Sequence, residues 1–120
     1  IDTGLINAIA PKVTTDHGRL LENIVFLELK RQNKEAYFYH HPDYEVDFII
    51  KDGLKIKQLI QVCYSLADSD TKKREIKALL KASKELRCKE LVIITQDEEK
   101  EEKISGAVIK IIPAWKWLLL

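Results

Sequence analysis

Two neighbouring apolar segments of the sequence each contain a polar residue where a strand would favour an apolar one. Asp47 interrupts the segment 45–50, and Gln61 interrupts the segment 59–64. Metal-dependent phosphodiesterases use such an arrangement, in which an acidic side chain on one strand lies beside polar side chains on the next. The two segments therefore predict a site of that kind, either working or reduced to a remnant.

The elements that would position these residues alternate between helical and extended patterns. Three strands in a row predict a meander, and a helix between two strands predicts that those strands are parallel. We expect a helix at 17–32, strands at 36–40, 45–50 and 55–64, a helix at 71–87, a strand at 91–95, a loop or short solvated helix at 96–103, and a strand at 107–112. This order indicates an α/β sandwich around a mixed central sheet.

The first helix has apolar side chains around most of its circumference, which is typical of a mostly buried helix. Its polar stripe is narrow and consists of Arg19, Asn23 and Lys30. Two carboxylates, Glu22 and Glu28, interrupt the apolar surface. A buried carboxylate needs a cation or hydrogen-bond donors to stay ionised, so each of them either pairs with a neighbouring Arg or Lys or belongs to a site.

The second helix is amphipathic. Its core-facing residues are Ile76, Leu79, Leu80 and Leu86, and four lysines recur on its solvent side: Lys73, Lys77, Lys81 and Lys84. Such a row is either a solvated helix face or a stripe that contacts phosphates. The chain has 20 basic and 19 acidic residues and a net charge of +1, so any DNA binding depends on local clusters of charge.

The 120 residues are enough for one domain with its own core. The chain begins with Ile1 and contains no Met, so we expect it to be a domain of a longer polypeptide. We interpret residues 1–16 as a connecting segment, with a short helical turn at 5–10, and residues 17–120 as the domain.

Two further features bear on the location of the protein. No apolar run approaches the roughly 18 residues that a membrane helix needs, and no signal peptide is visible, so we expect a cytoplasmic protein without a membrane partner. Cys63 and Cys88 lack the spacing of metal ligands, which favours free thiols over a disulfide.

Four segments of the chain together resemble one known domain family. They are Gly18-Arg19-Leu20-Leu21-Glu22-Asn23, Glu45-Val46-Asp47-Phe48, Gln61-Val62-Cys63-Tyr64 and Lys73-Arg74-Glu75-Ile76. The family is the DUF4143-type C-terminal domain of archaeal and bacterial AAA-type ATPases, within the PD-(D/E)XK nuclease superfamily. The resemblance covers nearly the whole chain and implies a restriction-endonuclease-like αβββαβ sandwich. It also implies an upstream ATPase module that binds ATP. This chain contains no phosphate-binding glycine loop, which agrees with that module lying outside it.

The resemblance implies a role for each polar residue of the strand pair. Asp47 would be the metal-binding acid, with Mg²⁺ as the cation because hard cations prefer oxygen ligands. Gln61 would supply a second ligand, and Glu22 a further acid from the first helix. The lysine of the superfamily, which offsets transition-state charge, falls on position 63, where this chain has Cys63.

Lys57 is a candidate replacement for that lysine. A three-residue loop at 51–53, with Gly53 in the left-handed conformation, would place Lys57 on the same face as Asp47 and roughly opposite it. A two-residue loop at 52–53 would instead turn Asp47 to the other face of the sheet. The alternative interpretation is that Lys57 is a solvated strand lysine paired with a strand carboxylate.

Three functions agree with these observations. The first is a nuclease-fold domain that binds DNA or a partner protein without efficient cleavage, as an accessory to the ATPase module. The second is an active Mg²⁺-dependent DNA endonuclease that uses Asp47, Glu22, Gln61 and Lys57. The third is a structural module that packs against the ATPase or forms homo-oligomers.

Overall fold

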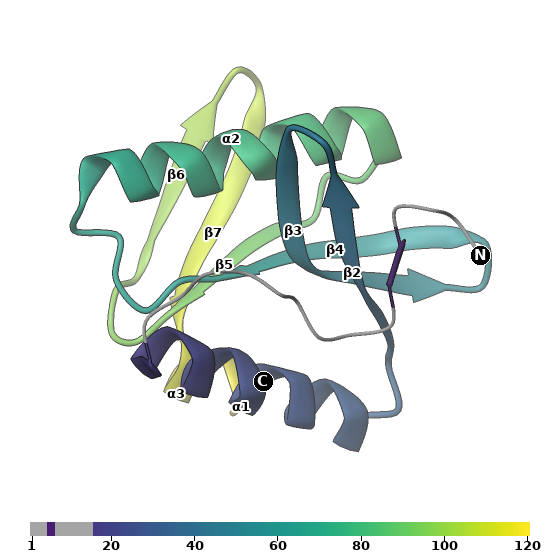
Figure 1. Cartoon of the computed structure of the whole chain (residues 1–120), viewed down its shortest axis with the longest axis horizontal. Coiled ribbons are helices and arrows are strands. Elements are labelled where there is room, and N and C mark those ends of the chain that lie inside the picture. Colours follow the sequence, from purple (N-terminus) through teal and green to yellow (C-terminus); the bar gives the residue numbers. More distant parts are fainter. Residues whose placement is uncertain (1–4, 7–15) are drawn as a thin grey trace.

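The computed structural model describes Leu5–Ile6 and residues 16–120 of the chain. Within this part, two layers of helix enclose one seven-stranded sheet (Figure 1). In chain order the elements are β1 (Leu5–Ile6), α1 (Asp16–Arg31), β2 (Glu35–His41), β3 (Tyr44–Asp52), β4 (Lys55–Val62), α2 (Ser69–Leu86), β5 (Leu91–Thr95), β6 (Lys100–Ile104), β7 (Ala107–Pro113) and α3 (Ala114–Trp117). The predicted α/β class with a mixed sheet is confirmed.

The sheet changes from antiparallel to parallel pairing at β4. Its strand order is β1-β2-β3-β4-β5-β7-β6. The pairs β1–β2, β2–β3 and β3–β4 are antiparallel. β5 is parallel to both β4 and β7, and α2 connects β4 to β5, as predicted. β6 pairs antiparallel with β7 at the outer edge.

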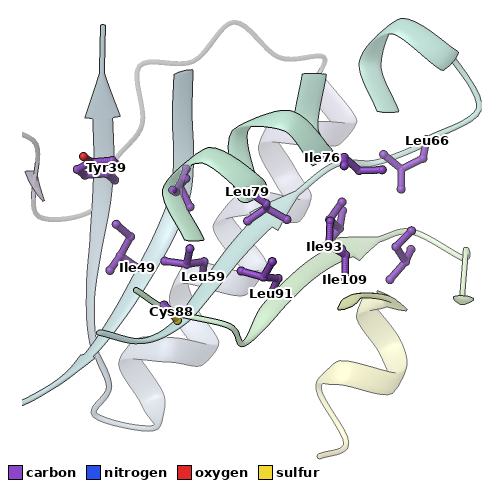
Figure 2. Packing of buried hydrophobic residues seen from close by; sticks show 13 residues of the cluster. Tyr39, Ile49, Leu59, Leu66, Ile76, Leu79, Cys88, Leu91, Ile93 and Ile109 are labelled. Atoms are coloured by element: carbon purple, nitrogen blue, oxygen red, sulfur yellow. The ribbon is translucent and has the colours of Figure 1, made fainter. Parts of the chain in front are cut away.

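Each face of the sheet has its own apolar core. α2 covers one face, and α1 and α3 lie on the other (Figure 1). On the α2 side, Leu79 packs with Leu59 and Ile93 (Figure 2). On the α1 side, Val25 packs with Ile60. All five residues of β5 are buried, which confirms the prediction of a strand covered on both faces.

α1 buries only one of its sides. Leu21, Val25 and Leu29 are buried, whereas Leu20 and Leu27 are more than half exposed. The prediction of a mostly buried helix is therefore wrong for the outer side, because the sheet contacts only the stripe of α1 that faces it. Within the described ranges, no helix combines the length and the apolar character that a membrane crossing requires.

β6 corrects the prediction of a loop or short helix at 96–103. Ser105 and Gly106 both have positive φ, at 51° and 81°, and this conformation suits a two-residue hairpin turn. The turn folds the chain back so that β6 pairs with β7. The lysines and glutamates of β6 suit an edge strand, because charge opposes pairing with a further chain.

At the start of the helical turn expected at 5–10, Leu5–Ile6 instead forms β1 and pairs with β2, and residues 7–10 lie outside the described part of the chain. The rest of the predicted connecting segment 1–16 lies outside the described residues, apart from Asp16, which is the first residue of α1.

Leu59 and Leu54 provide a matched test of the core. Leu59 is fully buried, and Leu54 in the β3–β4 turn is fully exposed. We expect Leu59→Ala to lower the free energy of unfolding by about 2–5 kcal/mol, because it leaves a cavity. Leu54→Ala should change it by less than about 0.5 kcal/mol. Urea denaturation measures both, and equal losses for the two variants would contradict the assigned β3–β4 register.

Candidate functional site

The β3–β4 hairpin differs from both predicted loop geometries. Asp52 pairs with Lys55, so the loop consists of Gly53 and Leu54, with Gly53 left-handed at φ 66°. Further along the hairpin, a register shift inserts Lys57 as an extra residue of β4. The three-residue loop predicted from the sequence is therefore wrong, although the left-handed Gly53 is confirmed.

Lys57 does not lie opposite Asp47. Phe48 pairs with Ile60, so the position in line with Asp47 is that of Gln61, four residues along β4 from Lys57. At about 3.3 Å per residue, Lys57 is displaced along the strand by about 13 Å. Lys57 is also exposed. The predicted placement of Lys57 opposite Asp47 is therefore wrong, because the turn lies at Gly53–Leu54 and one residue of β4 is inserted, and together these shift the hairpin register by four residues.

Asp47 and Gln61 join β3 to β4 where their backbone ladder ends, and we call this pair the polar bridge. Oδ2 of Asp47 accepts a hydrogen bond from the backbone N–H of Val62 at 2.7 Å. Oε1 of Gln61 accepts one from the backbone N–H of Asp47 at 2.9 Å, and its Nε2 donates to the backbone oxygen of Glu45 at 3.0 Å. The side chains of Asp47 and Gln61 thus form hydrogen bonds with backbone groups of β3 and β4 that would bond to each other if the ladder continued.

A bulge in β3 lies at the polar bridge. The pairs Tyr37–Ile49 and Tyr39–Val46 leave two residues of β3, one of them Asp47, across from a single residue of β2. An extra residue of this kind bends the strand and disrupts the local ladder. Val46 and Ile49 accordingly belong to the same core, although residues three apart in a regular strand face opposite sides.

Glu75 of α2 is a third buried polar residue at this point, and reasoning from the sequence missed it. Its Oε2 lies 3.4 Å from Nε2 of Gln61, and the residue is almost completely buried. Glu75, Ala78 and Ala82 are all buried in α2. Their spacing, with two small residues three and seven positions after the glutamate, is the signal that indicates close approach of this helix face to the sheet.

The polar bridge does not fit a Mg²⁺ ion. Asp47 is 1% exposed and Gln61 is 0% exposed, whereas Mg²⁺ in proteins keeps several waters. One oxygen of each side chain already accepts a backbone hydrogen bond. Among the residues that the structure describes, no group of three or more His, Cys, Asp or Glu side chains could hold a metal ion. In this arrangement Asp47 and Gln61, two of the three predicted metal ligands, serve as hydrogen-bond partners of the backbone.

Glu22, the further predicted acid, and Cys63, which occupies the position of the superfamily lysine, have different surroundings. Glu22 is half-buried on α1, on the opposite face of the sheet from α2 (Figure 1). Sγ of Cys63 donates to the backbone oxygen of Ser65 at 3.1 Å. Position 63 thus supplies a neutral donor and no positive charge. Cys63 and Cys88 are both free thiols, as predicted.

Three lysines on the outer side of α2 line two grooves. The larger groove, of about 540 Å³, lies between α2 and β6, and the smaller, of about 300 Å³, lies between α2 and the β2–β3 hairpin. Both are lined by Lys73, Lys77 and Lys81. The larger groove also contains the apolar residues Ile76, Leu80 and Ile104.

Four exposed lysines of α2 form no ion pair within the described part of the chain. We call Lys73, Lys77, Lys81 and Lys84 the lysine row; all four are exposed, and the ion pairs of the described residues include none of them. Lys72 differs, because its Nζ lies 2.6 Å from Oε1 of Glu102 and this hydrogen bond raises the pKa of Lys72. Glu102 also pairs with Lys100, so its carboxylate already has two lysine partners outside the lysine row.

The β2–β3 hairpin is tied to the C-terminal half of α2, and the sequence did not predict this contact. The hydroxyl of Tyr44 donates to Oε2 of Glu85 at 2.6 Å. The ring of His41 stacks on Tyr44 at 4.4 Å between centroids, and its Nε2 lies 3.7 Å from the same carboxylate oxygen. Burial, followed by the bond to Glu85, raises the pKa of Tyr44. The contact fixes the wall of the smaller groove.

Residues 17–117 match the family described as "Domain of unknown function (DUF4143)". The chain belongs to this family. The DUF4143 chain is also 46% identical over 112 residues to the uncharacterized protein MJ1544 of Methanocaldococcus jannaschii. That alignment covers 85% of this chain and 25% of the relative, so the chain spans about a quarter of the relative's length. No solved structure matches the DUF4143 chain.

Substitution of Asp47 tests the polar bridge. Asp47→Ala leaves the buried N–H of Val62 without its acceptor, and we expect it to lower the free energy of unfolding by about 1–3 kcal/mol. Asp47→Asn keeps an acceptor oxygen at the same position, so its loss should be smaller. Urea unfolding of both variants measures the difference. An Asp47→Ala protein as stable as the wild type would contradict the structural role.

Proposed function

We propose that this DUF4143 domain binds the phosphate backbone of nucleic acid without cleaving it, as a nuclease-like accessory domain of the PD-(D/E)XK type. One contrast supports the proposal: the polar bridge is buried and bonded to backbone, whereas the lysine row is exposed and forms no ion pair among the described residues. Metal-assisted hydrolysis needs an open coordination site. Binding of a polyanion needs only accessible positive charge.

The lysine row has the dimensions of a phosphate-contacting surface. At a rise of 1.5 Å per residue, the eleven steps from Lys73 to Lys84 extend about 16 Å along α2. Duplex DNA carries one charge per about 1.7 Å of its axis, so a row of this length faces several phosphates. Lysines contact phosphates as point charges and do not read base edges. We therefore expect affinity that depends strongly on salt and weakly on base sequence.

The setting that we propose is a longer polypeptide with an upstream AAA-type ATPase module. The four sequence segments that resemble the C-terminal domains of such ATPases support it. The length of the Methanocaldococcus jannaschii relative, of which this chain matches 25%, agrees with it. In that setting the ATPase module would bind and hydrolyse ATP while the DUF4143 domain holds the nucleic acid.

An acidic segment of a partner protein is a second candidate ligand. The larger groove beside the lysine row has an apolar floor of Ile76, Leu80 and Ile104. Apolar side chains of an amphipathic segment use such a floor, whereas phosphates do not. Leu80→Ser distinguishes the two ligands, because it should weaken binding of an acidic amphipathic peptide and leave binding of nucleic acid unchanged.

Two double substitutions with the same change of charge test the lysine row. Lys77→Glu with Lys81→Glu should weaken binding to a short DNA duplex by at least about tenfold and lower the salt slope of log K by about 2. The control, Lys55→Glu with Lys57→Glu in the β3–β4 hairpin, should change the affinity by less than about threefold. Fluorescence anisotropy over a salt series measures both. Equal losses for the two pairs, or no binding at low salt, would contradict the proposal.

A cleavage assay separates the proposal from an active endonuclease that uses Asp47, Glu22 and Gln61. We expect the wild-type protein with Mg²⁺ to nick supercoiled plasmid no faster than Asp47→Asn, because the polar bridge leaves no open position for a hydrated ion. Nicking that is abolished by Asp47→Asn would establish the endonuclease instead. Agarose gels of a time course provide the measurement.

A further inference from the structure

The outer side of α1 exposes a continuous apolar stripe. Leu20 is 60% exposed, Ile24 37% and Leu27 64%, while the opposite side of the same helix packs on the sheet. Single exposed apolar residues are ordinary, but several on one helix face mark a surface that another structure contacts. We call Leu20, Ile24 and Leu27 the α1 stripe.

The spacing of the α1 stripe suits contact with one other helix. Leu20 and Ile24 are four residues apart, and Ile24 and Leu27 are three apart. This alternation of four and three is the a and d pattern of a two-helix seam, in which side chains of one helix insert between those of the other. It is narrower than the apolar face that a helix needs to pack on a sheet.

The polar residues along one flank of the α1 stripe indicate which helix contacts it. Asp16, Asn23 and Lys30 are all exposed and are spaced by seven residues, so they lie along one line of α1. A two-fold axis passing at Asn23 would place Asp16 of one copy beside Lys30 of a second copy, and the reverse. The two asparagines would meet at the axis. The opposite charges of this line thus face each other twice when the second helix runs antiparallel.

We propose that two copies of this chain associate through an antiparallel pair of α1 helices, with the α1 stripes in contact and Asp16 paired with Lys30 across the axis. A parallel pair would bring Lys30 toward the flank of the partner helix that carries Glu28, whose carboxylate is already bonded to Arg31 and Gln32 of its own helix. α1 lies on the face of the sheet opposite α2 (Figure 1). The association therefore leaves the lysine row accessible and does not depend on nucleic-acid binding.

Sedimentation equilibrium of the 120-residue chain over a range of concentrations tests the proposal. We expect a reversible dimer whose dissociation constant rises at least about tenfold in Leu27→Glu, because that change buries a charge in the seam. Leu54→Glu is the matched control, since Leu54 is an exposed leucine outside α1, and it should leave the dimer unchanged. A monomer at all concentrations, or a dimer that Leu27→Glu does not weaken, would overturn the proposal.

A charge exchange tests the orientation of the two helices. Lys30→Asp alone should weaken the dimer by about tenfold, because it turns two attractive pairs into repulsive ones. Adding Asp16→Lys should restore the affinity to within about threefold of the wild type. Circular dichroism verifies that α1 remains folded in both variants. A double variant that stays as weak as Lys30→Asp would overturn the antiparallel α1 pair.

Discussion

The bond between the carboxylate of Asp47 and the backbone N–H of Val62 is the interaction on which the rest of the structure depends. The bulge in β3 disrupts the ladder to its neighbour, and an unpaired buried N–H costs about as much as a lost hydrogen bond. Asp47 and Gln61 supply the missing partners from their side chains. The residues that resemble a nuclease site therefore hold β3 and β4 together beyond the end of their backbone ladder, whether or not any chemistry takes place there.

The order of the elements could be predicted because each pattern is local. The apolar run of β5 and the lysine spacing of α2 depend on a few neighbouring residues only. Lys57 could not be placed, because a hairpin register depends on the turn and on bulges, and a shift of one residue moves every side chain to the other face. Glu75 was missed for a similar reason, since its burial depends on a glutamine of a distant strand. β6 was missed because its charged residues are typical of a solvated loop, while its pairing with β7 follows from the turn at Ser105 and Gly106.

The sheet separates two surfaces of opposite character. α2 presents positive charge beside an apolar groove on one face, and α1 presents an apolar stripe on the other. Because a helix covers each face, a ligand on α2 and a second chain on α1 do not compete for space (Figure 1). A pair of domains joined through α1 would direct its two lysine rows outward, so that two nucleic-acid segments, or two regions of one, are held at a fixed separation.

The position of β7 determines the order in which the sheet is completed. β7 follows β6 in the chain but lies between β5 and β6. β2, β3 and β4 pair with their sequence neighbours, and such local contacts form quickly, whereas the parallel partners of β5 must come from distant parts of the chain. During synthesis, β5 therefore has one side without a strand until β7 has left the ribosome. The most apolar strand of the domain is then the one that a chaperone would have to shield.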